Sequence, residues 1–417
     1  MEGAAVDGPS PVRPKTEITA AEWGLLLTLA GIQLTNVLDF VILMPLGPRI
    51  IVEFGIEPWQ FGLLVSAYGF SASAASLAAA LVLDRFDRKT SLLVLYVGFI
   101  LSTALCAIAR NFEVMLVGRF AAGAFGGVLA AGVLAVVGDV FADYRRGTAM
   151  GVVMSAFSVA SIFGIPAGLL AAEHFGSGAP FGLLAGVCVL NWLFAAWALP
   201  SMRGHLREKH DPPLTVLWTI VREPNHLRAF AFMVALVLSS FMVVPYLATY
   251  VQLNVGRAES EIKYIYFFGG LATIVSMNVI GRIADRFGKL LVFRVMALAT
   301  VALTCVVTML PRTSLWVVLT VTTAYMVTSS GRMVPAQAMI TGSAAKHLRG
   351  GFLSVTAAVQ HLAIGLATLV AGGIIQQTPE GKISGYWQVG IHAAVFAGIA
   401  MYIAGRLRSG ETAVHEG

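Results

Sequence analysis

The chain has 417 residues, of which 57% are hydrophobic and only 12% are charged, and its mean hydropathy is +0.80. A water-soluble domain carries about a quarter charged residues, so this composition excludes a soluble protein and predicts an all-α integral membrane protein. The net charge of +6 is not accompanied by a continuous basic face, which argues against nucleic acid as a partner. The three cysteines lie at scattered positions inside apolar stretches, so we expect no disulfide and no metal site.

Hydropathy and helix-breaking residues predict twelve membrane-spanning helices along the chain. Their approximate ranges are 23–48, 58–82, 90–109, 114–138, 148–172, 180–200, 228–252, 263–285, 290–310, 314–338, 350–374 and 386–406. We expect two six-helix bundles over residues 23–200 and 228–406, a polar loop at 201–227, and tails at 1–22 and 407–417. Most of the 28 Lys and Arg residues lie on the side of the N-terminus, which predicts that both termini are cytoplasmic. In the loop, the apolar run 214–221 fits a plain linker with a snorkelling helix as well as an amphipathic helix along the inner membrane surface.

The first predicted helix carries an acid, Asp39, in the middle of an apolar stretch. Every other Asp or Glu of the chain falls in a tail, in a loop or near a predicted helix end. Thr35 and Asn36 precede Asp39 by one helical turn and therefore share its helix face. Because an acid inside the membrane marks an ion or substrate path by default, we expect Asp39 to bind and release a proton and this polar stripe to face a cavity.

The fourth predicted helix carries Arg119 at a depth from which its side chain can reach Asp39. Two interpretations stay open, namely a purely structural ion pair and a pair that takes part in proton coupling. A neutral carboxyl group costs little to bury, whereas an ionised one needs Arg119 or water. A conformational change that alters this balance would let Asp39 take up a proton on one side and release it on the other.

The same helix is rich in small residues over 118–139. No strand precedes them and no Gly-Lys-Ser/Thr sequence follows, so we interpret them as helix-packing residues and not as a nucleotide-binding loop. The chain contains no phosphate-binding loop elsewhere, and we expect no cofactor. An ion gradient, not ATP, is then the expected source of energy.

The chain repeats itself. The tripeptide Asp-Arg-Phe at 84–86, after the second predicted helix, recurs at 285–287 after the eighth, and the starts of the fifth and eleventh helices match as well. Two matches at nearly the same offset, about 200 residues, indicate two halves in the same orientation, as in transporters whose halves rock around a central site. The same alignment places Ser240 of the seventh helix against Asp39. The helical scaffold therefore does not itself require an acid at this place.

These features resemble the major facilitator superfamily. The resemblance rests on the paired Asp-Arg-Phe loops, on Arg119 in a Gly-rich fourth helix, and on Gly-Ile-Pro-Ala-Gly at 164–168 in the fifth, and it extends over residues 22–406. Within the superfamily the chain is similar to bacterial proton-coupled drug and sugar exporters. This implies a monomeric carrier of the bacterial inner membrane that exchanges a small drug-like or sugar-like molecule for protons by alternating access. It also implies that Gly164, Pro166 and Gly168 form a helix kink associated with efflux.

Other functions remain to be compared with export. The alternative within transport is an importer or facilitator of a sugar, a nucleoside or another metabolite. A membrane-embedded enzyme is disfavoured, because the sequence offers no cluster of His, Asp and Glu and no Ser/His pair at one depth.

The resemblance further implies that the two repeated loops close the cytoplasmic side. In the family the acid of such a loop is held by the start of the eleventh helix, and an acid at the end of the fourth helix, here Asp139, would receive Arg88. A carboxylate beside a helix N-terminus is favoured by about 0.3–1 kcal/mol. Ala80 and Asp87 depart from the family pattern, which has glycine at both places. The residues expected to act in gating are Asp84, Arg85, Arg88, Lys89, Asp139, Gly281, Asp285, Arg286, Gly288 and Lys289.

Polar residues of several predicted helices are candidates for the lining of a substrate cavity. They are Thr35, Asn36, Tyr68, Tyr246, Tyr250, Arg332, Gln337 and His361. Tyrosines near helix ends are also explained as anchors at the membrane interface, and a lone histidine such as His361 is more often a packing residue. The scarcity of charges disfavours a strongly anionic cargo, although Arg119 and Arg332 could bind an acid group.

Overall fold

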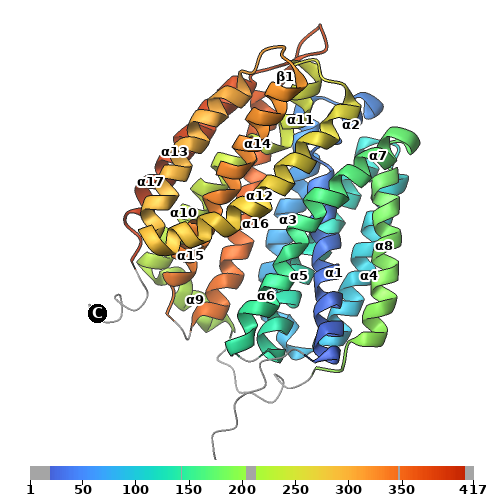
Figure 1. Cartoon of the computed structure of the whole chain (residues 1–417). Coiled ribbons are helices and arrows are strands. Elements are labelled where there is room, and N and C mark those ends of the chain that lie inside the picture. The colour runs from blue at the N-terminus through green and yellow to red at the C-terminus, as the bar shows by residue number, and fades with distance from the viewer. Residues whose placement is uncertain (1–18, 142, 203–212, 346–347, 409–417) are drawn as a thin grey trace, which may run out of the picture.

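The computed structural model describes residues 19–141, 143–202, 213–345 and 348–408, and these residues are mostly helical (Figure 1). Within them, 11 helices are long and apolar enough to cross a membrane. The span predicted at 314–338 is built from two shorter helices, α14 (Leu315–Gly331) and α15 (Met333–Gly342). The structure thus confirms the predicted all-α membrane fold, with 12 spans in two six-helix bundles.

The first bundle comprises α1 (Ala20–Ile42), α2 (Gly47–Phe54), α3 (Pro58–Val82), the 3-10 turn η1 (Leu83–Arg85), α4 (Arg88–Ile108), α5 (Phe112–Val140), α6 (Asp143–Val159), the π-helical turn η2 (Ala160–Gly164), α7 (Ile165–Phe175) and α8 (Ala179–Ala198). The second comprises α10 (Pro224–Phe241), α11 (Val244–Leu253), α12 (Glu259–Phe287), α13 (Lys289–Thr308), α14, α15, α16 (Arg349–Ile374) and α17 (Tyr386–Ala404). A small antiparallel hairpin of β1 (Gln376–Gln377) and β2 (Ile383–Ser384), with Gln376 opposite Ser384, joins α16 to α17. We call the end of the molecule where α1 begins and α17 ends the base, and the end with α2 and β1 the top (Figure 1).

Helix α9 (Pro213–Arg222) stands between the two bundles in the sequence. In space it lies at the base, where it contacts α10 and α16 (Figure 1). Ile220 is fully buried, whereas the side chains of Trp218 and Val221 are 58% and 44% exposed. The run 214–221 is therefore helical, as both interpretations of the loop expect, and apolar side chains lie on its outer face.

The first and seventh spans are broken, although the sequence predicted continuous helices at 23–48 and 228–252. Helix α1 ends at Ile42 and α2 starts at Gly47, with Pro48 in its first turn. Helix α10 likewise ends before α11, which has Pro245 in its first turn. Proline has no N–H and fits the first turn of a new helix better than the interior of a long one. The breaks leave Asp39 and Ser240 in the last turns of α1 and α10.

Small residues bring the helices into close contact. A Cβ atom at Gly123 of α5 would collide with Tyr68 backbone atoms of α3. A Cβ atom at Gly69 of α3 would lie 2.7 Å from the carbonyl oxygen of His361 on α16. The glycines therefore allow backbones to approach, which agrees with the packing interpretation of the fourth predicted helix.

The buried apolar side chains form clusters that distinguish the two ends of the molecule. The largest cluster, near the top, contains residues of both bundles, such as Phe61 of α3 and Tyr246 of α11. Toward the base, each bundle has a cluster of its own, around Val133 in the first and Phe352 in the second. The two bundles thus share one core at the top and have separate cores at the base.

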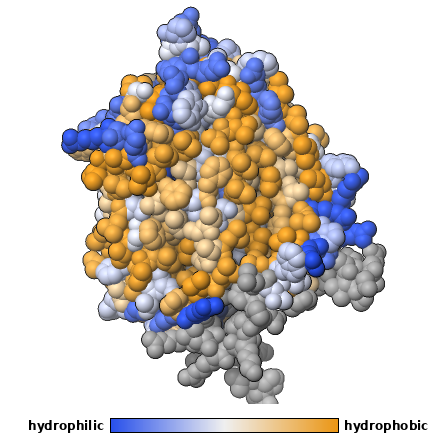
Figure 2. All heavy atoms as spheres, turned by 180° about the vertical axis from the view of Figure 1, so that it is seen from behind, coloured by the Kyte–Doolittle hydropathy of each residue, from blue (hydrophilic) through white to orange (hydrophobic). Residues whose placement is uncertain are grey.

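The flanks of the bundles are apolar. Figure 2 shows a broad hydrophobic surface between polar ends. Exposed apolar side chains of the membrane-spanning helices include Leu101, Leu190 and Val395. Such a band matches the hydrocarbon core of a bilayer, which is about 30 Å thick.

Candidate functional site

Asp39 and Arg119 meet inside the first bundle, where both side chains are fully buried. Arg119 Nη1 of α5 donates to Asp39 Oδ2 over 2.7 Å, and Thr103 of α4 donates to Asp39 Oδ1 over 3.1 Å. Three helices therefore contribute to this carboxylate site. The structure brings together the two residues that the sequence proposed as partners and adds Thr103, which sequence reasoning missed.

The end of helix α1 contributes to the same contact. The last four carbonyl groups of a helix have no intrahelical donor, and Asp39 lies in that last turn. Arg119 Nη1 donates to the Asp39 carbonyl oxygen over 3.0 Å as well as to its carboxylate. The Arg119 guanidinium carbon also lies 4.8 Å from the centre of the Tyr68 ring, a cation–π contact. The arginine thus stabilises both the negative charge of Asp39 and a backbone carbonyl group in the last turn of α1.

The polar stripe next to Asp39 is hydrogen-bonded within the bundle. Thr35 shares a 2.9 Å hydrogen bond with Tyr96 of α4. Asn36 donates to the Gly126 carbonyl of α5 over 2.8 Å and accepts a 2.5 Å hydrogen bond from Tyr68 of α3. All of these side chains are buried, so in this conformation the stripe joins helices α1, α3, α4 and α5.

The second bundle contains a related arrangement without an acid. Arg332 lies at the break between α14 and α15 and is fully buried. Its Nη2 donates to Ser240 Oγ over 2.7 Å, and Ser240 lies 3.3 Å from Ser329 Oγ. Ser240 is the residue that the repeat aligns with Asp39, so the contact of Ser240 with Arg332 corresponds to that of Asp39 with Arg119. The sequence had singled out each residue of this second contact but not their proximity.

Phe40, the neighbour of Asp39, lies where the buried clusters meet. Its ring centre is 5.2 Å from that of Tyr68 and 6.0 Å from that of Phe241. Phe241 follows Ser240 as Phe40 follows Asp39, so equivalent rings of the two bundles touch each other. Phe40 packs against the shared cluster and against both separate clusters. Because Phe40 is the next residue after Asp39, a movement of Asp39 would also move a ring that contacts the second bundle.

The remaining cavity candidates have varied surroundings. Tyr246 donates to the Pro58 carbonyl over 3.1 Å, and Tyr250 donates to the Leu310 carbonyl over 3.0 Å, both near the top. Gln337 on α15 is partly exposed. On α16, His361 Nδ1 is buried without a hydrogen-bond partner among the described residues.

The fifth span carries its Gly-Ile-Pro-Ala-Gly sequence next to α1. The π-helical turn η2 ends at Gly164, and α7 follows with Pro166 in its first turn. A Cβ atom at Gly164 or Gly168 would lie 2.8 or 2.6 Å from the side chains of Leu38 or Ile42. A π-helical turn is a common cause of a helix kink, and here Gly164 at its end and Gly168 in α7 allow this span to approach α1.

At the base, the structure brings Arg88 to Asp139. Arg88 Nε lies 3.1 Å from Asp139 Oδ2, and this pair joins the start of α4 to the end of α5. Asp87, which departs from the family pattern, accepts hydrogen bonds of 3.0 Å from the backbone N–H groups of Lys89 and Met202. It is the N-cap of α4, which is a common role for aspartate.

The other residues of the repeated loops lie around the ends of α3 and α12. The side chain of Asp84 is outside the described part of the chain. The side chains of Arg85, Asp285, Arg286 and Lys289 are exposed. Gly281 lies within α12, and Gly288, with φ +92°, ends it. A positive φ favours glycine, so the glycine at position 288 has a backbone reason.

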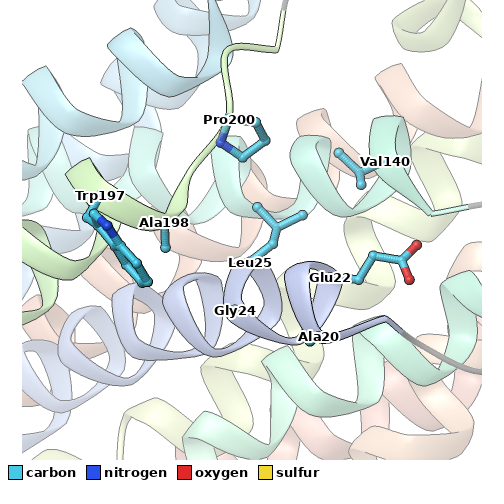
Figure 3. Close-up of a pocket in the computed structure, with 8 residues that line it drawn as sticks. All are labelled: Ala20, Glu22, Gly24, Leu25, Val140, Trp197, Ala198 and Pro200. Atoms are coloured by element: carbon cyan, nitrogen blue, oxygen red, sulfur yellow. The ribbon is translucent and has the colours of Figure 1, made fainter.

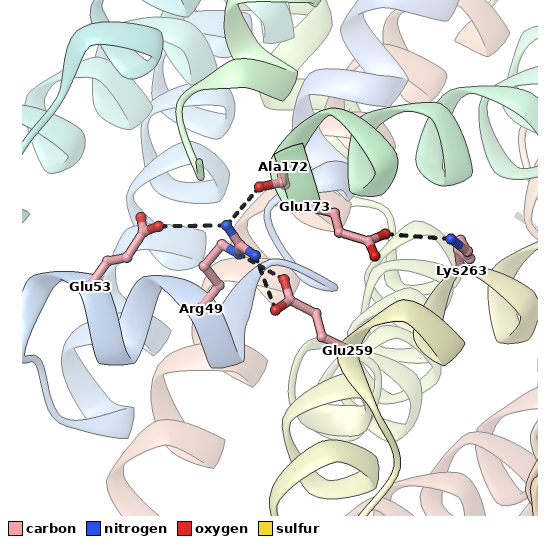
Figure 4. Close-up of polar contacts among 6 residues, drawn as sticks. All are labelled: Arg49, Glu53, Ala172, Glu173, Glu259 and Lys263. Carbon is pink, nitrogen blue, oxygen red and sulfur yellow. Dashed lines mark hydrogen bonds and ion pairs between the residues drawn. The ribbon is translucent and has the colours of Figure 1, made fainter. Parts of the chain in front are cut away.

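At the top, charged residues connect the two bundles (Figure 4). Arg49 of α2 makes two hydrogen bonds to the Glu259 carboxylate of α12, of 2.7 and 3.1 Å, and a third of 2.6 Å to the Ala172 carbonyl. Lys263 lies 3.4 Å from Glu173. Hydrogen bonding to Glu259 raises the pKa of Arg49 above its ordinary value. These contacts were missed because the sequence gives no sign of which helix ends meet.

Two recesses of the described surface do not have Asp39 in their lining, although the second one reaches its neighbours Thr35 and Leu38. One recess of about 410 Å³ is at the base, between the start of α1 and the ends of α5 and α8 (Figure 3). Its lining residues are Ala20, Glu22, Gly24, Leu25, Val140, Trp197, Ala198 and Pro200. Another of about 230 Å³ lies between α1, α7 and α8, with Leu38 and Phe163 among its lining residues. Both are mainly apolar. Among the described residues no group of three or more His, Cys, Asp or Glu could hold a metal ion.

Comparison with known proteins agrees with this architecture. The sequence profile described as Major Facilitator Superfamily matches residues 29–368. The chain is 24% identical over 354 residues to the uncharacterized MFS-type transporter YceJ of Bacillus subtilis, which covers 84% of this chain and 88% of that protein. It is 27% identical over 236 residues to a probable sugar efflux transporter of Helicobacter pylori, covering 55% of this chain and 58% of the relative.

Solved structures are similar in fold. A bacterial homolog of the human lysosomal transporter Spinster, in its inward-facing and occupied conformation, has a TM-score of 0.73 at 16% identity, over 94% of this chain and 98% of that chain. The nucleoside transporter NupG has a TM-score of 0.70 at 12% identity, over 92% and 99% of the two chains. At these identities the likeness is one of fold alone.

Proposed function

We propose that this chain, which belongs to the Major Facilitator Superfamily, exports a small organic molecule across the membrane in exchange for protons. The observation that carries the proposal is the buried pair of Asp39 and Arg119. A purely structural role would not explain why the matching helix of the second bundle has Ser240 in place of the acid. Ionisable groups buried inside a membrane protein mark ion pathways by default.

Proton binding changes the contact in a simple way. When Asp39 is ionised, its negative charge is matched by the guanidinium of Arg119. A proton on Asp39 removes that charge, and Arg119 Nη1 loses its ionic partner while keeping the carbonyl of the same residue. The ionic attraction that holds the end of α1, including the neighbouring Phe40, against Arg119 is then lost. A proton can shift a conformational equilibrium only by such a difference between states.

The present conformation supports an alternating-access cycle. The bundles share a core and ion pairs at the top but have separate cores at the base. With the base on the cytoplasmic side, as the distribution of Lys and Arg favours, this conformation is closed to the outside. The loops at the base, including Arg88 and Asp139, then act in closing the inner side during the other half of the cycle.

Export, and not import, is favoured by two similarities. A relative over part of the chain is a probable sugar efflux transporter, and the Gly-Ile-Pro-Ala-Gly sequence resembles the kink motif of exporters. We therefore place the protein in the bacterial inner membrane as a monomer, with a sugar-like or drug-like molecule as its cargo.

The test is proton movement in a reconstituted system. Purified protein in liposomes with an acidic interior and an internal pH dye should release protons when a cargo is added outside. The Asp39→Asn variant should lose at least 90% of this flux while reconstituting normally, since amide and carboxyl groups have nearly the same size. Glu380→Gln, which removes an exposed carboxylate at the top, is the matched control. Unchanged proton flux in Asp39→Asn would contradict the proposal, and cargo movement in the same direction as protons would replace export by import.

A further inference from the structure

Arg332 has unused hydrogen-bonding capacity in a fully buried place. Only its Nη2 has a hydrogen-bond partner, Ser240 Oγ at 2.7 Å. Its Nε and Nη1 atoms are buried without a partner among the described residues. A buried donor without an acceptor is destabilising, and more so when it is charged. Among the described residues, two nitrogens of Arg119 are unpaired in the same way. The difference between the two arginines is therefore that Arg119 donates to a carboxylate, whereas Arg332 donates to an uncharged hydroxyl group.

The second bundle offers no acid that could neutralise Arg332. Its Asp and Glu residues over 228–406 are Glu259, Glu261, Asp285 and Glu380. The first three lie in the first and last turns of α12, and Glu380 lies in the hairpin between β1 and β2. All are at the ends of the bundle, whereas Arg332 is at a helix break in its interior. In the first bundle, Asp39 already binds Arg119.

The comparison of the two bundles identifies what is missing. Arg119 binds a carboxylate that comes from the last turn of α1. Arg332 binds, at the matching place in the last turn of α10, a hydroxyl group that carries no charge. Ser240 is shorter than aspartate, so the second bundle lacks both the volume and the charge of one carboxylate group.

The place is also suitable for a transported molecule. Ser240 is followed by Phe241, whose ring contacts Phe40 of the other bundle. The Arg332 site is therefore adjacent to the surface along which the bundles separate in alternating access. The hydroxyl group of Tyr325 is also buried without a hydrogen-bond partner among the described residues. Tyr325 lies two helical turns before Arg332 in the same span and so shares its face of the helix.

We propose that Arg332 binds a carboxylate group of the cargo, so that the molecule carried is an organic monoanion. This inference rests on the proposed transport function and specifies its substrate class. The ligand carboxylate accepts hydrogen bonds from the guanidinium and from Ser240, in the role that Asp39 has toward Arg119. One negative charge matches the single cation. A phosphate monoester, which carries about 1.5 to 2 charges at pH 7, would remain partly uncompensated.

Thermal-shift measurements on the purified protein in detergent test the site without a pH gradient. The probes are carboxylates paired with neutral analogues of the same shape: glucuronate with glucose, benzoate with benzamide, and hexanoate with hexanamide. We expect at least one carboxylate to raise the melting temperature at concentrations where its neutral partner does not. Arg332→Gln should weaken that binding by at least tenfold, and Arg332→Lys should weaken it less.

Ser240→Asp provides a test that does not depend on losing the arginine. It places a carboxylate of the protein beside Arg332 and should raise the melting temperature of the ligand-free protein relative to Ser240→Asn. It should also abolish the shift caused by carboxylates, because the counter-ion is then built in. Persistence of the carboxylate shift in Ser240→Asp, or the absence of any preference for carboxylates over neutral analogues in the unmodified protein, would overturn the proposal.

These results are separable from those on proton coupling. Ligand binding at constant pH requires no proton movement. Absence of a carboxylate shift in the unmodified protein, together with proton flux that requires Asp39, would reject the anion site alone. A carboxylate shift that requires Arg332, together with proton flux that does not require Asp39, would instead reject proton coupling and keep the anion site.

Discussion

Arg119 uses a single nitrogen, Nη1, to donate both to the carboxylate and to the backbone carbonyl of Asp39, over 2.7 and 3.0 Å. The contact thus depends on the end of helix α1 as much as on the charge of the acid. A continuous helix through Pro45 would engage that carbonyl in an intrahelical hydrogen bond. The break in the first span and the ion pair are therefore parts of one arrangement.

Removal of Arg119 should destabilise the protein strongly. Arg119→Gln leaves a buried carboxylate without its counter-ion, and breaking a buried pair in this way costs about 3–5 kcal/mol. The double variant Asp39→Asn/Arg119→Gln should recover much of this loss, because it leaves no buried charge. Melting temperatures and denaturant midpoints of the purified variants in detergent measure both effects. Additive losses in the double variant would mean that the two residues do not interact energetically.

The glycines of α5 offer a direct test of helix packing. Gly123→Ala should destabilise the protein by about 1–3 kcal/mol, because the new methyl group meets backbone atoms of Tyr68 that cannot rotate away. Gly138→Ala on the same helix is the matched control, since nothing lies within 4 Å of its added Cβ atom. Alanine has the higher helix propensity, so this control should be neutral or slightly stabilising. Equal melting temperatures for the two variants would show that α3 and α5 are not closely packed.

Hydropathy and internal repetition were sufficient to predict the spans and the two bundles, and the depths of Asp39 and Arg119 in their helices predicted that the two residues could meet. Hydropathy depends on composition averaged over a window, so it could not reveal the breaks after Ile42 and Phe241, which depend on local backbone geometry. Thr103 could not be identified either. Its partner lies 64 positions away in sequence, and a threonine inside an apolar helix resembles any other threonine bonded to its own backbone.

Contacts between the bundles could not be predicted from the sequence for a related reason. Arg49 and Glu259 are 210 positions apart and belong to different bundles. Their contact exists only in conformations where the tops of the bundles are together. A single sequence encodes several such conformations and does not indicate which pairs of helix ends meet in each.

The ion pairs at the top should hold the bundles together at that end. Arg49→Gln or Glu259→Gln removes a partly exposed pair worth about 0.2–1 kcal/mol, which corresponds to at most a fivefold change in the ratio of conformations. Spin labels at Val52 and Trp316, which are 72% and 75% exposed on different bundles, would report the separation of the tops by pulsed electron resonance. We expect a larger population of long distances in both variants. Lys382→Gln, in a pair within the second bundle, should leave the distribution unchanged, and a similar change in all three variants would exclude a specific role of the Arg49–Glu259 pair.

Asp87 should stabilise the base of the first bundle. Its Oδ1 atom accepts from the backbone N–H groups of Lys89 and Met202, and its Oδ2 atom accepts a 2.7 Å hydrogen bond from Ser201. Asp87→Ala should lower the free energy of unfolding by about 1 kcal/mol, as expected for the loss of an N-cap, and should speed amide hydrogen exchange in the first turn of α4. Asp87→Asn keeps an acceptor oxygen and should exchange nearly as slowly as the unmodified protein. If both variants exchange equally fast, the negative charge of Asp87, and not its capping oxygen, is what stabilises the start of α4.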